Sequence, residues 1–246
     1  MTASPPSSSL TVGVLGGMGP DATVDFMAKV LAATPASADQ DHVHMLIDHN
    51  PHVPDRTRAI LARDGEPGPV LAQMAKQLQD GGADIIVMPC NTAHAFQQDI
   101  EAVLDVPFVS IIDETAAACA QFEAVGLLAT RGCLASGVYD AALSAAGVRA
   151  VMPDDAETTA FMELTTRIKA GESGAEVGAR MQQLANALVA RGAQAVIAGC
   201  TEIPLVLDQS MLDVPLVSST DILAEATVAY ALGNKDLNQK RQGSKA

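Results

Sequence analysis

The chain has 246 residues, of which 48% are hydrophobic and only 3% aromatic, and it carries a formal net charge of −14. This length suits one large or two small domains, each with a core of aliphatic side chains. The acidic balance argues against a nucleic-acid-binding surface, because neutralising phosphates needs clustered Lys and Arg. An anionic substrate would need a local cationic site to overcome the charge of the whole chain.

Cysteine usage and the N-terminal composition indicate the compartment. None of the four cysteines belongs to a Cys-x-x-Cys pair, which argues against a disulfide scaffold and against a zinc ribbon. Residues 1–10 are rich in Ser and Pro and lack the basic and apolar segments of a signal peptide. No apolar run reaches the length that crosses a bilayer. We therefore expect a cytoplasmic protein with free thiols and no membrane association.

The first half of the chain alternates predicted strands with predicted helices. A glycine-rich loop, Gly16–Pro20, follows the first strand, and a loop with two prolines, His49–Arg56, follows the second. Apolar residues at helical spacing that end at a Gly-Gly pair predict the second helix. In order, we expect strands over residues 11–15, 43–47, 85–88 and 105–110, and helices over 21–33, 70–80, 93–103 and 113–121.

The second half of the chain repeats this order. Val125–Ala129 resembles Val12–Gly16 at an offset of 113 residues, and Asp213–Ser218 matches Asp105–Ser110 at an offset of 108 residues. Landmarks at nearly constant spacing indicate that one α/β unit occurs twice. The remaining predicted elements are strands over 149–152 and 195–198, and helices over 161–171, 176–191 and 221–232.

Alternating strands and helices predict parallel sheets. The predicted fold is α/β, with two lobes related by a pseudo-twofold axis and an active site in the cleft between them. Each lobe is expected to hold a central, mainly parallel four-stranded sheet flanked by helices. The first lobe is predicted to comprise residues 10–110 and 214–233, and the second residues 111–213. Residues 1–9 and 234–246 are predicted to be flexible tails.

Two of the apolar runs end in a cysteine. Ile85–Met88 leads to Cys90, and Ala195–Ala198 leads to Cys200. Parallel sheets carry their chemistry at the carboxyl edge, so the two lobes would bring both thiols to one cleft. Inverting a stereocentre by proton transfer needs a base on one face of the carbon and an acid on the other, which two thiols supply. We expect each cysteine to begin a helix whose N-terminus lowers the pKa of the thiol.

Short motifs around both cysteines are specific in combination and in order. Met-Pro-Cys-Asn-Thr-Ala-His at 88–94 and Gly-Cys-Thr-Glu at 199–202 resemble the two signatures of the aspartate/glutamate racemase family. The resemblance is to its cofactor-independent aspartate racemase branch and extends over about residues 10–232. Further segments that resemble that branch are Gly16–Pro20, Asn50–Thr57, Leu127–Thr130, Ser136–Tyr139 and Lys169–Gly171.

The resemblance implies a cofactor-independent enzyme that interconverts L- and D-aspartate through Cys90 and Cys200, and it also implies a homodimer. Arg56 and Lys169 would help to hold or activate the dicarboxylate, which fits the need for local cations on an acidic protein. The other residues expected in the substrate pocket are Met18, His52, Asn91, Thr92, Thr130, Thr201 and Glu202.

Two residues depart from the pattern of that branch. His52 stands beside Arg56 where the branch usually has Gln, and Cys133 stands where Thr is expected. Both departures concern which acidic or amide side chain the pocket accepts, rather than the type of reaction.

Several residues have a simpler interpretation. Cys119, flanked by alanines in a helix, and Cys133, placed in a loop, are expected to be core cysteines. His94 is expected to be structural, although a Cys–His pair with Cys90 is conceivable. Gly17–Ala22 imitates a dinucleotide fingerprint, but that interpretation leaves the paired cysteines unexplained.

Three other functions stay open at this stage. One is a glutamate racemase, and another is a dicarboxylate isomerase or decarboxylase of the same superfamily, acting on a compound such as maleate or an arylmalonate. A non-enzymatic dicarboxylate-binding protein is the third. A metal site is not expected, because the four histidines from His42 to His52 lie on a strand and a proline-rich loop in a spacing that suits one tetrahedral site poorly.

Overall fold

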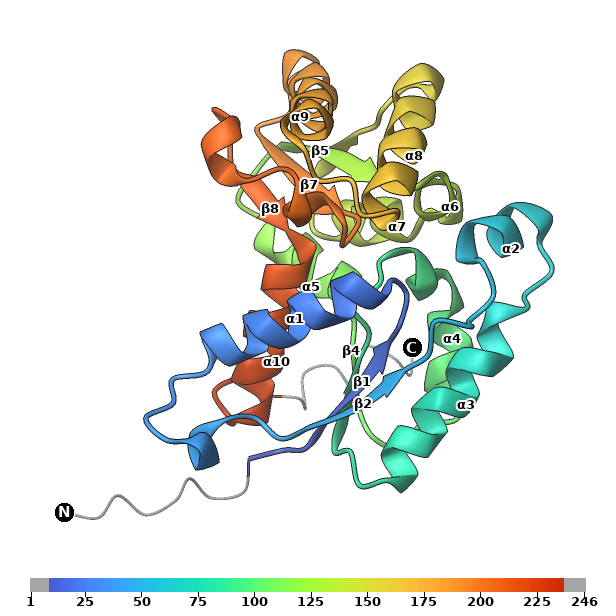
Figure 1. Ribbon diagram of the computed structural model, residues 1–246, viewed down its shortest axis with the longest axis vertical. Helices are drawn as coiled ribbons and strands as arrows, with labels where there is room; N and C mark the ends of the chain where they lie inside the picture. Colours follow the sequence, from blue (N-terminus) through green and yellow to red (C-terminus); the bar gives the residue numbers. More distant parts are fainter. Residues whose placement is uncertain (1–8, 237–246) are drawn as a thin grey trace.

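Two parallel β-sheets, one in each lobe, organise the molecule. The structure is a computed structural model and describes residues 9–236. The first sheet has the strand order β2-β1-β3-β4 and the second the order β6-β5-β7-β8, and every pairing is parallel. Helices flank both sheets, and the two lobes lie one above the other in Figure 1. The predicted α/β fold with two four-stranded sheets is confirmed.

The first lobe follows the predicted alternation. Pro20 occupies the first turn of its first helix, and the Asp55 carboxylate caps another by accepting from the Arg58 N–H. Its elements are β1 (Val12–Gly16), α1 (Pro20–Ala33), the 3₁₀ turn η1 (Asp39–Asp41), β2 (Met45–His49), α2 (Arg56–Ala62), α3 (Pro67–Asp80), β3 (Ile85–Val87), the 3₁₀ turn η2 (Thr92–Phe96), α4 (Gln97–Glu101) and β4 (Phe108–Val109).

The second half of the chain begins with the helix α5 (Ile111–Ala118) and ends with α10 (Ser219–Ala231). A capping box between Asp154 and Glu157 starts its longest helix but one. Between α5 and α10 lie β5 (Ala124–Ala129), α6 (Arg131–Ser136), α7 (Val138–Ala145), β6 (Arg149–Val151), α8 (Asp155–Lys169), α9 (Ala175–Ala190), β7 (Ala195–Gly199), the 3₁₀ turns η3 (Ile203–Leu205) and η4 (Gln209–Met211), and β8 (Leu216–Ser218).

The strand registers show that the internal repeat is structural. Val12 of β1 is paired with Ile85 of β3, and Val125 of β5 is paired with Ala195 of β7. Both residues of the second pair lie at the predicted offsets from those of the first. Because β3 and β7 are therefore equivalent strands, Cys90 and Cys200 follow equivalent strand ends.

Strand β8 corrects the predicted boundary between the lobes. Residues 214–233 were expected in the first lobe, but Leu216 is paired with Val196 of β7, and this hydrogen-bonded ladder places β8 in the second sheet. The chain returns to the first lobe with α10, which lies along α1 (Figure 1). Lys29 of α1 forms an ion pair with Asp221 of α10.

Some local elements also differ from the prediction. The sequence pattern did not indicate α2, α6 or α7, and the helix expected over 93–103 is the 3₁₀ turn η2 followed by the short α4. Cys133 lies in α6 and not in a loop. Residues 1–8 and 237–246 of the predicted tails lie outside the described residues, whereas Lys235 donates to the Glu114 carboxylate.

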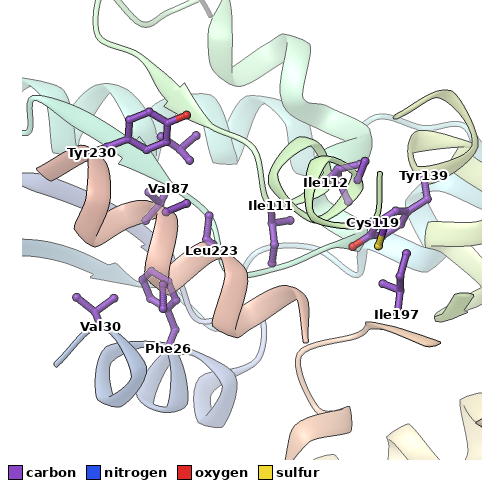
Figure 2. Close-up of a cluster of buried hydrophobic side chains, with 14 of the residues drawn as sticks. Phe26, Val30, Val87, Ile111, Ile112, Cys119, Tyr139, Ile197, Leu223 and Tyr230 are labelled. Atoms are coloured by element: carbon purple, nitrogen blue, oxygen red, sulfur yellow. The ribbon is translucent and has the colours of Figure 1, made fainter. Parts of the chain in front are cut away.

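One apolar core joins the two lobes. Figure 2 shows Phe26 and Val87 of the first lobe, Ile197 of the second, and Leu223 of α10 in the same cluster. All four side chains are fully buried. Burial of this kind stabilises each side chain by about 1.5–3 kcal/mol, so the shared core fixes how the two sheet edges face each other. Within the described residues, no helix combines the length and apolarity that a membrane crossing requires.

Candidate active site

Cys90 and Cys200 line one cavity between the lobes. The cavity has a volume of about 380 Å³ including its open mouth. Each cysteine is only 5% exposed, and all four cysteines of the chain are free thiols. The sequence-based expectation that the two strand ends meet at one site therefore agrees with the structure. The lining residues are Met18, Asp55, Arg56, Thr57, Cys90, Asn91, Thr92, Thr130, Lys169, Cys200, Thr201 and Glu202.

The local backbone places each thiol at the sheet edge. Pro89 ends the strand before Cys90, whose N–H donates to the Met88 carbonyl at 2.8 Å. Gly199 precedes Cys200 in a tightly packed position, where a Cβ would lie 3.0 Å from the Leu128 carbonyl oxygen. The cysteines are followed by the 3₁₀ turns η2 and η3 and not by the expected α-helices. Stabilisation of a thiolate by an α-helix N-terminus is therefore not available at either cysteine.

Cys200 has a carboxylate as its direct neighbour. Its Sγ donates to Glu202 Oε2 at 2.8 Å, and Glu202 is only 4% exposed. Burial and the Glu202 carboxylate raise the pKa of the Cys200 thiol well above its ordinary value, although Lys169 opposes the shift. This is the reverse of the lowered pKa expected from the sequence.

Two cations enter the cavity from opposite lobes. Lys169, at the end of α8, places Nζ 3.7 Å from Glu202 Oε1. Burial disfavours the Lys169 ammonium, but Glu202 and the two cysteines raise its pKa overall. Arg56 begins α2, and its Nη1 donates to the carbonyls of Val53 at 3.0 Å and Pro54 at 3.1 Å. These bonds hold the guanidinium group at the edge of the cavity.

Short polar side chains connect the lobes across the cavity. Thr92 Oγ1 lies 2.7 Å from Thr130 Oγ1 of the second lobe. Asn91 Oδ1 accepts from the Tyr139 hydroxyl at 2.6 Å, and Asn91 Nδ2 donates to Ser219 Oγ at 3.0 Å. The side chain of Asn91 therefore has a structural task in addition to lining the cavity.

The structure does not place every expected residue in the cavity. His52 is exposed and does not belong to the lining, because the loop turns it outwards where its N–H donates to Asn50 Oδ1. Asp55 and Thr57 do line the cavity but were not selected from the sequence. Their signal was present, since both belong to the Asn50–Thr57 motif.

The simpler interpretations of three residues agree with the structure. His94 Nδ1 donates to the Cys90 carbonyl at 2.8 Å, and its Nε2 accepts from the Ile111 N–H at 3.2 Å, so its ring supports the backbone and not the thiol. Cys119 and Cys133 are fully buried outside the cavity lining. Burial raises the pKa of Cys119 to about 11 and that of Cys133 to about 12.

The glycine-rich loop faces the opposite lobe. Gly17 needs a positive φ of 91°, and a Cβ there would lie 2.3 Å from the Asn50 backbone. A Cβ on Gly19 would lie 3.1 Å from Glu202 Oε1. An anionic side chain beside the loop is unfavourable for a dinucleotide pyrophosphate, so the site supports the paired-cysteine interpretation. The described residues contain no cluster of three or more His, Cys, Asp or Glu side chains arranged to hold a metal ion.

Gly132 controls how closely α6 approaches α2, and Gly132→Ala is expected to displace the segment that carries Arg56. A Cβ at this position would lie 2.7 Å from Thr57 Cα, which belongs to the backbone. We expect a loss of about 1–3 kcal/mol in the free energy of unfolding, measured by urea denaturation, together with reduced turnover. Gly174→Ala is the matched control, because nothing lies within 4 Å of a Cβ there. Equal stability and turnover for both variants would contradict this account.

The fold and the cavity together define a class of two-lobed α/β proteins with a buried thiol at the equivalent strand end of each lobe. A family model described as Asp/Glu/Hydantoin racemase matches residues 15–227. The chain therefore belongs to the Asp/Glu/hydantoin racemase family.

Individual relatives resemble the chain over most of its length. The broad-specificity amino-acid racemase RacX of Bacillus subtilis is 30% identical over 226 residues, covering 90% of this chain and 98% of RacX. The structure of Picrophilus torridus aspartate racemase superposes with a TM-score of 0.81 at 29% identity, covering 94% of this chain and 98% of that one. Francisella tularensis glutamate racemase, solved with D-glutamate, shares the fold with a TM-score of 0.68 at 18% identity, covering 92% and 82%.

Proposed function

We propose that the protein is a PLP-independent racemase of acidic amino acids that interconverts L- and D-aspartate through Cys90 and Cys200. The observation that carries the proposal is the pair of buried thiols at equivalent strand ends, both lining one cavity. Two acid–base groups in a pseudo-twofold arrangement match the symmetry of a racemisation, in which substrate and product are mirror images.

The proposed reaction has two proton transfers. One cysteine, as the thiolate, removes the proton from Cα, and the electron pair of the C–H bond stays on the substrate as a carbanion. The other cysteine, as the thiol, delivers its proton to the opposite face of Cα. Arg56 and Lys169 bind the carboxylates and offset the negative charge that develops in the transition state. No cofactor takes part in this sequence of steps.

Aspartate is favoured over glutamate by two considerations. Two cations from opposite lobes suit a small dicarboxylate, and the Picrophilus torridus relative is an aspartate racemase. The name of RacX describes a broad specificity, so neutral amino acids belong in the test as well.

A panel of enantiopure amino acids tests the proposal. The enzyme, purified with a thiol reductant and without added PLP, is incubated with L- and D-forms of Asp, Glu, Asn, Ala and Lys, and products are separated by chiral chromatography. We expect the highest kcat/KM for aspartate in both directions. Maleate is included because a superfamily isomerase would convert it. Conversion of maleate without racemisation of any amino acid would refute the proposal, as would aspartate binding without turnover.

A further inference from the structure

The two cysteines follow equivalent strands, but their neighbours two residues further on differ in charge. Cys90 and Cys200 are 110 residues apart, and the same offset relates Thr92 to Glu202. The pseudo-twofold arrangement therefore contains its own comparison. The first lobe has a neutral hydroxyl at the position where the second lobe has a carboxylate.

The contacts of these two residues are correspondingly different. On the Cys90 side, Thr92 Oγ1 is bonded to Thr130 Oγ1 at 2.7 Å. On the Cys200 side, Glu202 Oε2 accepts from Cys200 Sγ at 2.8 Å, and Oε1 faces Lys169 Nζ at 3.7 Å. Cys200 and Glu202 are both at least 95% buried, so water screens their interaction weakly.

This geometry assigns Glu202 a role other than the predicted substrate binding. Both of its carboxylate oxygens already have partners, namely Cys200 and Lys169. A carboxylate also repels the carboxylates of a dicarboxylic substrate. The cation that it engages, Lys169, remains half exposed at the cavity and is able to turn towards a substrate.

We propose that Glu202 is a positioning residue that keeps Cys200 in the thiol form, so that the resting enzyme has Cys90 as the base and Cys200 as the acid. This inference rests on the proposed function, because base and acid are defined by the racemisation. It deepens that function by distinguishing two cysteines that a symmetric mechanism treats as equal.

The protons balance over one cycle. The Cys90 thiolate accepts the Cα proton and becomes a thiol, while Cys200 gives its proton to the carbanion and becomes a thiolate. After product release, one proton passes through solvent from Cys90 to Cys200 and restores the resting form. The carboxylate of Glu202 drives this return, because a thiolate next to a carboxylate is unfavourable in a buried site.

Other charged groups at the cavity act on Cys200 in opposite directions. Lys169 on α8 favours the thiolate, whereas Glu202 disfavours it and is its hydrogen-bonded neighbour. Arg56 and Asp55 on α2 line the same cavity with opposite charges, and Cys90 lies across it. The experiment must therefore remove the charge of Glu202 alone.

Site-resolved alkylation measures this effect without substrate. The full-length protein is treated with iodoacetamide between about pH 6 and 10, and labelling of the Cys90 and Cys200 peptides is quantified by mass spectrometry. The midpoint of the pH profile is compared and not the rate, because the rate also depends on access to a buried sulfur. In the wild type, we expect Cys200 to label at higher pH than Cys90 does.

Glu202→Gln should lower the Cys200 midpoint by about one pH unit or more, which is about tenfold more labelling below the midpoint. Glu202→Asp, which keeps the charge, should restore most of the shift. Glu172→Gln is the matched control, because its exposed carboxylate pairs with Arg167 outside the cavity. It should leave the Cys200 midpoint unchanged.

Two outcomes would overturn the inference. One is an unchanged Cys200 midpoint in a Glu202→Gln protein that melts like the wild type. The other, which needs no variant, is a wild-type Cys200 that labels at the same pH as Cys90 or at a lower one. Neither readout uses racemase activity, so the failure of this inference and the failure of the proposed function are distinguishable.

Discussion

Replacing either Cys90 or Cys200 by serine is expected to lower the rate of racemisation by about 10²–10⁴-fold. A serine hydroxyl fills nearly the same space but is a far weaker acid than a thiol, so it supplies neither the base nor the acid of the proposed cycle. Because each cysteine serves one face of Cα, a single substitution should abolish turnover in both directions. Chiral chromatography of the product from L- and D-aspartate measures the effect.

Cys119→Ser provides the matched control for these two variants. It makes the same chemical change in a fully buried cysteine that does not line the cavity. We expect a loss of stability from the buried hydroxyl, with turnover per folded molecule close to that of the wild type. Wild-type racemisation in both cavity variants would show that the thiols are core residues and nothing more.

Arg56→Ala is expected to reduce kcat/KM for aspartate by about 10²–10³-fold, because it leaves a substrate carboxylate without its charged partner. The Arg56 guanidinium is held in place by the carbonyls of Val53 and Pro54, so its remaining nitrogens are oriented before substrate binds. Arg56→Lys should recover only part of the loss, since an ammonium keeps the charge but lacks the planar fork.

Arg58→Ala separates this effect from a general change in charge. Arg58 lies two residues further along α2, is about half exposed, and pairs with Asp64 and Glu66. Removing it changes the net charge by the same amount and should alter kcat/KM by less than about twofold, because exposed ion pairs contribute little. Equal losses in Arg56→Ala and Arg58→Ala would mean that Arg56 makes no specific contact with the substrate.

Strand positions and their repeat were predictable because each is a local pattern. A buried strand reads as a short apolar run, and two such runs ending in cysteine at a constant offset predict one shared site. The registers of Val12 with Ile85 and of Val125 with Ala195 agree with that prediction. Arg56, Lys169 and the short polar residues of the cavity were likewise found from their motifs.

Features that depend on the relation between the lobes were not predictable. His52 follows a proline in an exposed turn, and its neighbours in sequence do not show that the turn faces outwards. Strand β8 has the same sequence pattern as β4, and only its pairing with β7 assigns it to a sheet. The raised pKa of Cys200 arises from its burial and from the orientation of Glu202, neither of which is readable from the order of residues.

The most direct test of the two-thiol mechanism is the isotope content of aspartate after partial turnover in D2O. If one sulfur removes the Cα proton and the other delivers a solvent-derived one, product isolated at low conversion carries deuterium at Cα. The substrate recovered from the same mixture keeps its protium. We predict this result for L- and for D-aspartate alike. A product that retains the original protium would contradict the account, because it would mean that a single group carries the proton from one face to the other.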